Sequence, residues 1–385
     1  MTDDTLPDRV VDAEDFQRRI IQPSDFVADT AAFVDIRLPR SEGKASYSFV
    51  GPGVSQNADQ IVNLVEPHGF NIGAATMPHG VVNNPHLHFT AEVFICTRGD
   101  FRMTVGENDE QELNVGPGTV FSVPTWVFRG FENLGPDGPE GGWMFTVLGG
   151  DETGGVIWAP RVLRAAAETG LHLASDWTVV EANGSVPADV IEPFTPEQLA
   201  SVDTYSDQEL ADRVVRPEAL AWSSNALLSG VLDGHRCWVA PVIGNGLSED
   251  RRQASPITNP HGFSVEWLRI EPGSSTGTHR HSDTQVLLLV DGKLEVVVNR
   301  ADGALRRLPD AGSVVSIPED AWRDFVNVGD TEVLVAVVCG SDVPTRLEWD
   351  PSIETAALAA GWRRDASGKL APVELLGRPA EQGAL

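Results

Sequence analysis

An internal duplication constrains the fold of this chain more than any other feature of its sequence. The tetrapeptide PHGF at residues 67–70 returns at residues 260–263, which is 193 positions later. One inserted residue further on, the run GTVFSVP at residues 118–124 is matched by GSVVSIP at residues 312–318. A repeat of this length indicates that the chain consists of two copies of one structural unit.

Short apolar runs bounded by turn residues predict that each copy is built from β-strands. From Ser46 onward, runs rich in Val, Ile, Phe and Trp alternate with Gly, Pro, Asn and Asp, which is typical of a sandwich or barrel. Each copy closes with a Trp-x-Pro sequence and an Ala-rich segment that stops at a glycine, Gly170 or Gly361. Proline near the start and glycine at the end predict a short helix there.

These patterns divide the chain into four segments. In the connector, Thr195 with Gln198 and Ser206 with Glu209 have the spacing of capping boxes and predict two helix starts. The predicted segments are an N-terminal arm at 1–45, an N-terminal barrel with its helix at 46–174, the connector at 175–230, and a C-terminal barrel with its helix at 231–385.

Composition excludes several classes of function. The 385 residues include 28 Lys and Arg against 56 Asp and Glu, for a formal net charge of -28. Such a surface repels nucleic acid and anionic membranes, so we expect a small-molecule ligand and neither of those partners. The first residues are acidic where a signal peptide would be basic, which favours a cytoplasmic protein. The three cysteines form no CxxC pair and do not indicate a zinc site.

The stretch PHLHFTAE at residues 85–92 predicts a metal site in the first copy. Side chains alternate along an extended segment, so His86 and His88 lie on one face, and Glu92 rejoins them from the start of the next strand. Two imidazoles and one carboxylate form the facial triad that holds a divalent metal, typically iron, and leaves open positions. The competing interpretation is two solvated histidines beside an ordinary strand.

Each copy contains a histidine pair, a glycine turn, and then a Gly, five residues, a Pro and, nine residues later, an Asn. This order resembles the two sequence motifs of the cupin superfamily, and its duplication resembles a bicupin. The resemblance implies an all-β fold of two tandem double-stranded β-helix (jelly-roll) barrels with short helices after each barrel and a metal at the barrel centre. Cupins include dioxygenases, decarboxylases, isomerases and proteins that only bind or store, so the fold alone does not choose a reaction.

Carried over residue by residue, the motifs imply His86, His88 and Glu92 as metal ligands in the N-terminal barrel. The position of the usual fourth ligand, a histidine, is Arg129. A guanidinium stays protonated and cannot ligate a metal, so the motifs supply three ligands at most.

The second copy implies a weaker metal site. Its matching residues are His279, His281 and Gln285, and Arg323 stands at the fourth position. A neutral amide oxygen binds a divalent ion less tightly than a carboxylate does. Chemistry is therefore expected mainly in the N-terminal barrel.

Only the repeated histidines His68 and His261 are candidates for the missing fourth ligand in both copies. Each lies at the head of the strand that leads toward its histidine pair. The same repeat is equally typical of a turn in which histidine caps backbone groups. We favour the structural role.

The arginines at the fourth position have two interpretations. In one, Arg129 and Arg323 enter the barrels and hold an anionic substrate through the planar guanidinium fork. In the other, Arg129 pairs with Glu92 and replaces the metal, or both arginines turn outward. Trp126 and Phe94 are further candidates for substrate binding, because Trp126 precedes Arg129 and Phe94 shares the strand face of Glu92.

The leading hypothesis from sequence is a metal-dependent dioxygenase that acts on a small anionic aromatic or enolic compound, with Arg129 and Glu92 as catalytic candidates. Fe(II) ranks first as the metal, ahead of Mn, Ni or Zn. The alternatives are a non-oxidative Mn or Zn lyase, decarboxylase or isomerase, and a metal-free or non-catalytic bicupin that only binds a small molecule. We expect a homodimer or a compact monomer.

Overall fold

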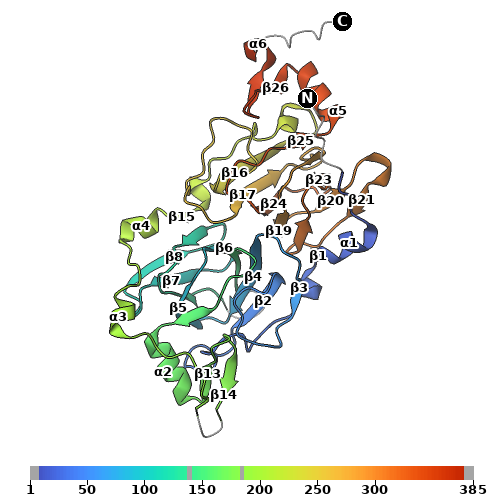
Figure 1. Ribbon diagram of the computed structural model, residues 1–385. Helices are drawn as coiled ribbons and strands as arrows, with labels where there is room; N and C mark the ends of the chain where they lie inside the picture. The colour runs from blue at the N-terminus through green and yellow to red at the C-terminus, as the bar shows by residue number, and fades with distance from the viewer. Residues whose placement is uncertain (1–7, 137–140, 183–185, 377–385) are drawn as a thin grey trace, which may run out of the picture. The chain divides into compact units, whose positions relative to one another are not determined.

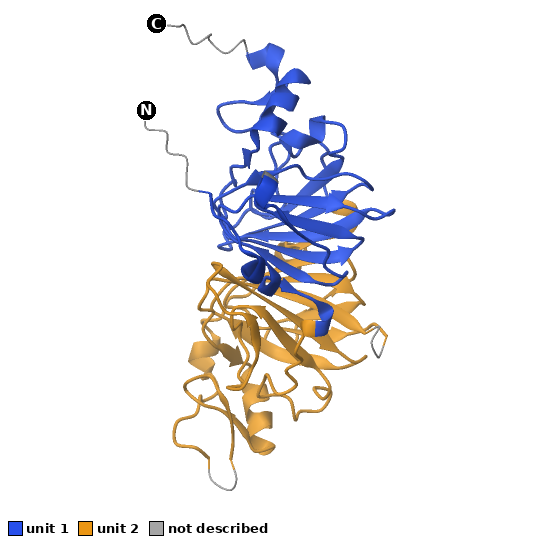
Figure 2. Cartoon of the chain, turned by 90° about the vertical axis from the view of Figure 1, so that its right-hand side faces the viewer, with its two compact units in different colours: residues 1–24, 220–385 blue, residues 25–219 orange. Residues whose placement is uncertain are grey.

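The structure, a computed structural model, describes residues 8–136, 141–182 and 186–376. Contacts divide the chain into two compact units, residues 1–24 with 220–385 and residues 25–219 (Figures 1 and 2). The two boundaries fall inside the segments predicted as arm and connector, so each segment contributes to both units. Among the described residues, no helix has both the length and the apolar character needed to cross a membrane.

The unit of residues 25–219 has two β-sheets that share an apolar core. Strands follow the order β15-β9-β6-β11-β4-β2-β3 in one sheet and β12-β5-β10-β7-β8 in the other. Phe94 of β6 and Phe121 of β9 cluster with Phe101 of β7 and Phe131 of β10, so the core lies between the sheets. The strands are β2 Ala45–Val50, β3 Val62–Leu64, β4 Phe70–Met77, β5 Val82–His88, β6 Glu92–Arg98, β7 Phe101–Val105, β8 Gln111–Val115, β9 Val120–Val123, β10 Arg129–Asn133, β11 Gly142–Gly149, β12 Val156–Trp158 and β15 Val214–Val215, with the hairpin β13 Leu171–Leu173 and β14 Val179–Glu181 beside them.

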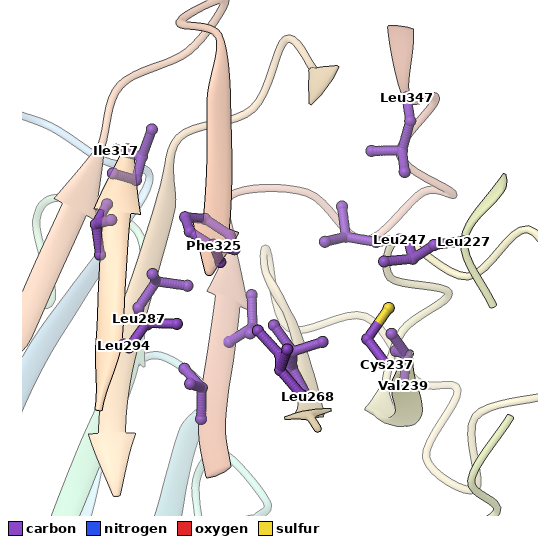
Figure 3. Packing of buried hydrophobic residues seen from close by; sticks show 14 of the residues in the cluster. Leu227, Cys237, Val239, Leu247, Leu268, Leu287, Leu294, Ile317, Phe325 and Leu347 are labelled. Atoms are coloured by element: carbon purple, nitrogen blue, oxygen red, sulfur yellow. The ribbon is translucent and has the colours of Figure 1, made fainter. Parts of the chain in front are cut away.

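The second unit repeats this arrangement. Its sheets have the orders β1-β22-β19-β24-β17-β16 and β21-β20-β23-β18-β25. Figure 3 shows part of its core, where Val239 of β16 and Leu268 of β17 are paired across the sheet and lie close together. The strands are β1 Ile20–Ile21, β16 Cys237–Ile243, β17 Ser264–Ile270, β18 His279–Arg280, β19 Gln285–Asp291, β20 Leu294–Val298, β21 Leu305–Arg307, β22 Val314–Ile317, β23 Arg323–Asn327, β24 Val333–Cys339 and β25 Glu348–Trp349, with the hairpin β26 Trp362–Arg364 and β27 Leu370–Pro372.

Helices are few and short, and four of them start where the sequence predicts. The helices α2 Pro160–Glu168 and α5 Pro351–Ala359 follow the two Trp-x-Pro sequences and end just before Gly170 and Gly361. Both predicted capping boxes are formed, at the starts of α3 Pro196–Leu199 and α4 Asp207–Ala211. The other helices are α1 Ala13–Arg18 and α6 Val373–Leu376, with 3-10 turns η1 Pro23–Asp25, η3 Pro217–Ala219, η4 Leu228–Val231 and η5 Ala301–Gly303. The mainly β architecture with a short helix after each barrel is confirmed.

Each barrel is completed by the segment that leads into the other copy. In the sequence RIIQP at residues 19–23, β1 pairs with β22 of the C-terminal barrel. In the sequence RVVRP at residues 213–217, β15 pairs with β9 of the N-terminal barrel. The first arginine of each sequence donates from Nη1 to a serine on the strand it joins, Arg19 to Ser316 Oγ at 3.2 Å and Arg213 to Ser122 Oγ at 3.3 Å. The duplication therefore starts earlier than residue 46. The two leading segments are exchanged, since the segment before each copy adds a strand to the barrel of the other copy.

Candidate metal centre

Three strands of the N-terminal barrel, two from one sheet and one from the other, bring the predicted ligands together. His86 and His88 end β5, and Glu92 begins β6 after a three-residue connection. Arg129 opens β10, and its Cα position is paired with that of His86 across the two strands. All four residues are buried, with at most 4% of each exposed. The interpretation as solvated surface histidines is therefore wrong, because the apolar core excludes water from both rings.

His86 is held so that one ring nitrogen faces the barrel interior. Its Nδ1 lies 2.7 Å from the carbonyl oxygen of Asn84, and its ring lies 5.2 Å from the ring of Trp158. A carbonyl oxygen accepts only, so Nδ1 carries the proton and Nε2 presents its lone pair. Burial and the nearby Arg129 charge lower the pKa of His86 to about 3, which keeps the ring neutral and able to bind a metal.

The ring of His88 has no hydrogen-bonding partner within the described part of the chain. Neither Nδ1 nor Nε2 makes a hydrogen bond to a described residue, and only 1% of the residue is exposed, so water does not replace such a partner. Its Nε2 lies 3.6 Å from Glu92 Oε1, beyond hydrogen-bonding distance. Burial and the Arg129 charge lower its pKa well below the ordinary range, so the ring is neutral. A buried ring without partners is unfavourable unless a ligand binds it.

Glu92 contacts Arg129 through one oxygen only. Arg129 Nε donates to Glu92 Oε2 at 2.9 Å, and Arg129 Nη1 donates to the Val127 carbonyl at 3.0 Å. Arg129 Nη2 makes no hydrogen bond to any described residue. Burial raises the pKa of Glu92, and the Arg129 guanidinium opposes this rise and favours the carboxylate. The ion pair of the second interpretation is formed, and it leaves Glu92 Oε1 and Arg129 Nη2 available to a ligand.

These residues fit a divalent metal ion. The ligand atoms of His86, His88 and Glu92 lie within 4.8 Å of one another, and all three residues are buried. Two neutral imidazole nitrogens and one carboxylate oxygen suit Mn, Fe, Ni or Zn. The unpartnered nitrogens of His88 are the observation that most favours such an ion, since no side chain of the described residues forms a hydrogen bond with them.

Comparison with known protein families gives two matches in the chain. The family model described as cupin domain matches residues 74–139 and again residues 266–339, one match in each copy. The chain is a bicupin of the cupin superfamily. The predicted membership of the cupin superfamily and the predicted fold class are both confirmed.

The solved structures similar to this bicupin include oxalate decarboxylases. The enzyme of Lactobacillus farciminis, in complex with formate, has 14% sequence identity and a TM-score of 0.53, with 88% of this chain and 90% of that chain covered. The Bacillus subtilis enzyme at pH 4.6 has 15% identity and a TM-score of 0.51, covering 91% and 87%. A further structure of the Bacillus subtilis enzyme, from a study of its Mn(II) centres, has 15% identity and a TM-score of 0.50, covering 84% and 77%. This likeness concerns the fold. No curated protein sequence matches the chain.

In the C-terminal barrel of the bicupin, a guanidinium takes the place that a metal would need. Arg323 Nη1 lies 2.9 Å from His281 Nε2 and donates to Gln285 Oε1 at 3.2 Å. Its Nε and Nη2 donate to two backbone carbonyls at 3.0 Å and 2.9 Å. His279 Nδ1 lies 2.7 Å from the Gly277 carbonyl, and its Nε2 has no partner among the described residues. Because Arg323 contacts His281 Nε2, only His279 Nε2 of this described histidine pair faces the site without a hydrogen-bonding partner. The described residues hold no second cluster of three metal-binding side chains.

The remaining candidates lie outside the metal cluster. His68 and His261 sit in matching turns, where each backbone N–H donates at 2.8 Å to an aspartate, Asp151 or Asp342. Phe94 is buried in the core, with its ring 5.3 Å from Phe131. These contacts agree with structural roles for all three, while their part in binding stays a prediction.

Trp126 lies half-buried within the second predicted motif of the first copy. Its backbone has φ 58°, which is unusual for a bulky residue, and its N–H lies 3.4 Å from the His88 carbonyl. The ring packs 5.8 Å from Phe89, the residue after His88. The Trp126 ring thus packs on Phe89 and is not one of the four central residues, and its part in substrate binding stays a prediction.

Sequence reasoning missed the residues behind His86. Asn84 accepts the His86 proton, and Lys44 and Asp35 form a buried ion pair next to it. Lys44 lies within the segment treated as an arm, and no local motif marks it. A signal does exist in the duplication, because the residue 193 positions after Lys44 is Cys237. When a buried charge is present in one copy and absent from the other, the needs of packing alone do not explain the charged residue at that position.

Proposed function

We propose that the N-terminal barrel binds a divalent metal ion, Mn(II) first, and catalyses a non-oxidative reaction on a small carboxylate. The reaction would be that of a decarboxylase, a lyase or an isomerase. The observation that carries the proposal is the buried, unpartnered His88 beside Glu92 Oε1 and the oriented Nε2 of His86. The Mn(II) centres named for one structural neighbour and the formate named for another support this choice of metal and substrate class over iron and oxygen.

His86, His88 and Glu92 would hold the ion, which when bound supplies Lewis-acid polarisation of a substrate carbonyl or carboxylate. Burial keeps both imidazoles neutral, so they do not have to lose a proton before they bind. Arg129 contributes a fixed positive charge at the edge of the same cluster. Its unpartnered Nη2 would donate to an oxygen of the substrate carboxylate, while Nε stays on Glu92. The apolar surroundings strengthen this charge-assisted hydrogen bond by excluding water.

The duplication supplies matched variants for the test. Protein loaded with Mn(II) is incubated without oxygen with a panel of small mono- and dicarboxylates, and carbon dioxide and carboxylate products are measured. We expect His88→Ala to abolish turnover and bound manganese, and His281→Ala, the same change in the other barrel, to leave both unchanged. Equal loss of turnover in the two variants would contradict the assignment to the N-terminal barrel. Less than roughly a tenth of an equivalent of bound metal after reloading would overturn the proposal and favour a metal-free binding protein.

An iron-dependent dioxygenase is the second candidate. Two histidines and one carboxylate are also the ligand set of non-haem Fe(II) oxygenases, and this observation keeps the candidate open. Oxygen uptake by Fe(II)-loaded protein with small enolic or aromatic acids separates the two reactions. Uptake that depends on substrate and disappears in His86→Ala would favour the dioxygenase, whereas turnover without oxygen would favour the first proposal.

A further inference from the structure

A buried ion pair lies behind the candidate metal centre. Lys44, 6% exposed, donates from Nζ to Oδ1 of Asp35, which is fully buried, and to Asn83 Oδ1 at 2.8 Å. The same Nζ lies 5.4 Å and 5.8 Å from the ring centroids of Phe33 and Trp158. The pair is thus enclosed by aromatic rings and amides, away from solvent.

This ion pair is connected to His86 through Asn84. Asp35 Oδ2 accepts from Asn84 Nδ2 at 2.8 Å and from the Asn84 backbone N–H at 3.3 Å. The carbonyl of the same residue accepts the proton of His86 Nδ1 at 2.7 Å. Lys44, Asp35, Asn84 and His86 therefore form one continuous chain of hydrogen bonds, which ends on the ring that presents Nε2 to the metal position.

The C-terminal barrel lacks the charged part of this chain. At the offset of 193 positions, Lys44 corresponds to Cys237 and Asn84 corresponds to Gly277. Cys237 is buried in the apolar core of its barrel. The Gly277 N–H is held instead by the Ser275 hydroxyl at 3.2 Å. The fold therefore tolerates an uncharged residue at the Lys44 position, and the charged version occurs in the barrel whose histidine pair has a carboxylate partner.

Stability does not account for the ion pair. Removing two charges from water is expensive, and replacing a buried ion pair by packed apolar residues is often neutral or stabilising. Outer partners of metal-binding histidines, in contrast, fix the tautomer and the ring orientation of the ligand. We propose that Lys44, Asp35 and Asn84 are positioning residues that hold His86 with Nδ1 protonated and Nε2 directed at the metal. The inference rests on the proposed metal site of the N-terminal barrel.

The test removes both charges together, because a single substitution would leave one charge buried and unpaired. In Lys44→Met/Asp35→Leu the charged part of the support is lost, and in Lys44→Met/Asp35→Asn a side chain able to hydrogen-bond Asn84 is retained. Mn(II) affinity is measured by calorimetry, and the tautomer of His86 is read from its ring ¹⁵N shifts in metal-free protein. We expect the leucine variant to bind Mn(II) 10- to 100-fold more weakly, the usual effect of losing such a partner. Its His86 should lose the single Nδ1–H tautomer, and the asparagine variant should recover part of both properties.

Two internal controls separate positioning from general damage. His279 makes the same contact to a backbone carbonyl in the other barrel, so its ¹⁵N shifts should not change. Arg280→Met removes a buried cation, 3% exposed, from the C-terminal barrel and should leave Mn(II) affinity unchanged. A folded leucine variant with unchanged Mn(II) affinity and an unchanged His86 tautomer would overturn the inference. If wild-type protein binds no Mn(II), the proposed function fails, while the tautomer of His86 still decides whether these residues position it.

Discussion

Replacing Glu266 by Gln should stabilise the C-terminal barrel at high pH and leave it unchanged at low pH. Glu266 lies on β17 and is 1% exposed. Its Oε2 accepts the Leu247 N–H at 3.0 Å, and burial raises the pKa of its carboxyl from 4.5 to about 7. Glutamine has the same shape, and its amide oxygen can accept the same hydrogen bond. The substitution therefore removes an ionisable proton with little change in packing.

The expected effect follows from the two pKa values. Between pH 4.5 and about 7 the folded protein retains a proton that the unfolded chain has lost, so this group destabilises the fold increasingly as the pH rises. Below pH 4.5 both states are protonated, and above pH 7 the full cost is present. At about 1.4 kcal/mol per pKa unit, the cost at pH 8 is roughly 3 kcal/mol. Glu266→Gln should raise the free energy of unfolding by up to that amount at pH 8 and by nothing near pH 4.5.

Urea unfolding followed by tryptophan fluorescence at pH 4.5, 6, 7 and 8 measures this difference directly. Glu332→Gln is a surface control for the loss of a carboxylate without burial, because 43% of the Glu332 side chain is exposed. Glu249, whose pKa burial also raises to about 7, titrates equally in the wild type and in the variant and cancels from the comparison. A difference between wild type and Glu266→Gln that does not change between pH 4.5 and 8 would refute the reasoning.

Two further predictions concern the arginines. Arg129→Met leaves the Glu92 carboxylate buried without its counter-ion, so metal-free protein should lose about 3–5 kcal/mol of unfolding free energy, and excess Mn(II) should restore most of it; unchanged stability by urea titration would contradict the pairing. Gln285→Glu supplies the missing carboxylate of the C-terminal barrel, yet Arg323 still uses His281 Nε2, so elemental analysis should find no additional metal. An extra equivalent of manganese in that variant would show that Arg323 moves away.

The fold could be predicted from the sequence because its evidence is repeated. The β-rich pattern, the Trp-x-Pro helices and the paired motifs each occur twice at a nearly constant offset, so tertiary context could not conceal them. The exchanged leading segments escaped prediction, although RIIQP and RVVRP are also repeated. A strand of two residues has almost no pattern of its own, and its partner lies far away in the sequence.

The site could be predicted only as a list of residues. Spacing along two strands places His86, His88 and Glu92 together, since strand geometry has a fixed period. Whether an arginine blocks the ring nitrogens of the histidines depends on the direction of its side chain and on shifts in its position of less than an ångström. Arg129 turns to Glu92 and leaves His88 without a partner, whereas Arg323 contacts His281 directly. The two copies have nearly the same motif and differ in that contact, which no sequence rule determines.

The exchanged leading segments also affect the order in which the molecule is made. Residues 8–24 leave the ribosome before either barrel, yet Ile20 pairs with Val315, almost three hundred residues later. Until then the β1 segment has no strand to join, and once the C-terminal barrel forms, the edge of β22 is open until β1 arrives. In the N-terminal barrel the interval between the synthesis of the two paired strands is shorter, because β15 follows β9 by less than one hundred residues. The N-terminal barrel can therefore close during synthesis, whereas the C-terminal barrel must recapture the start of the chain, and an unpaired edge strand in that interval is a site for aggregation.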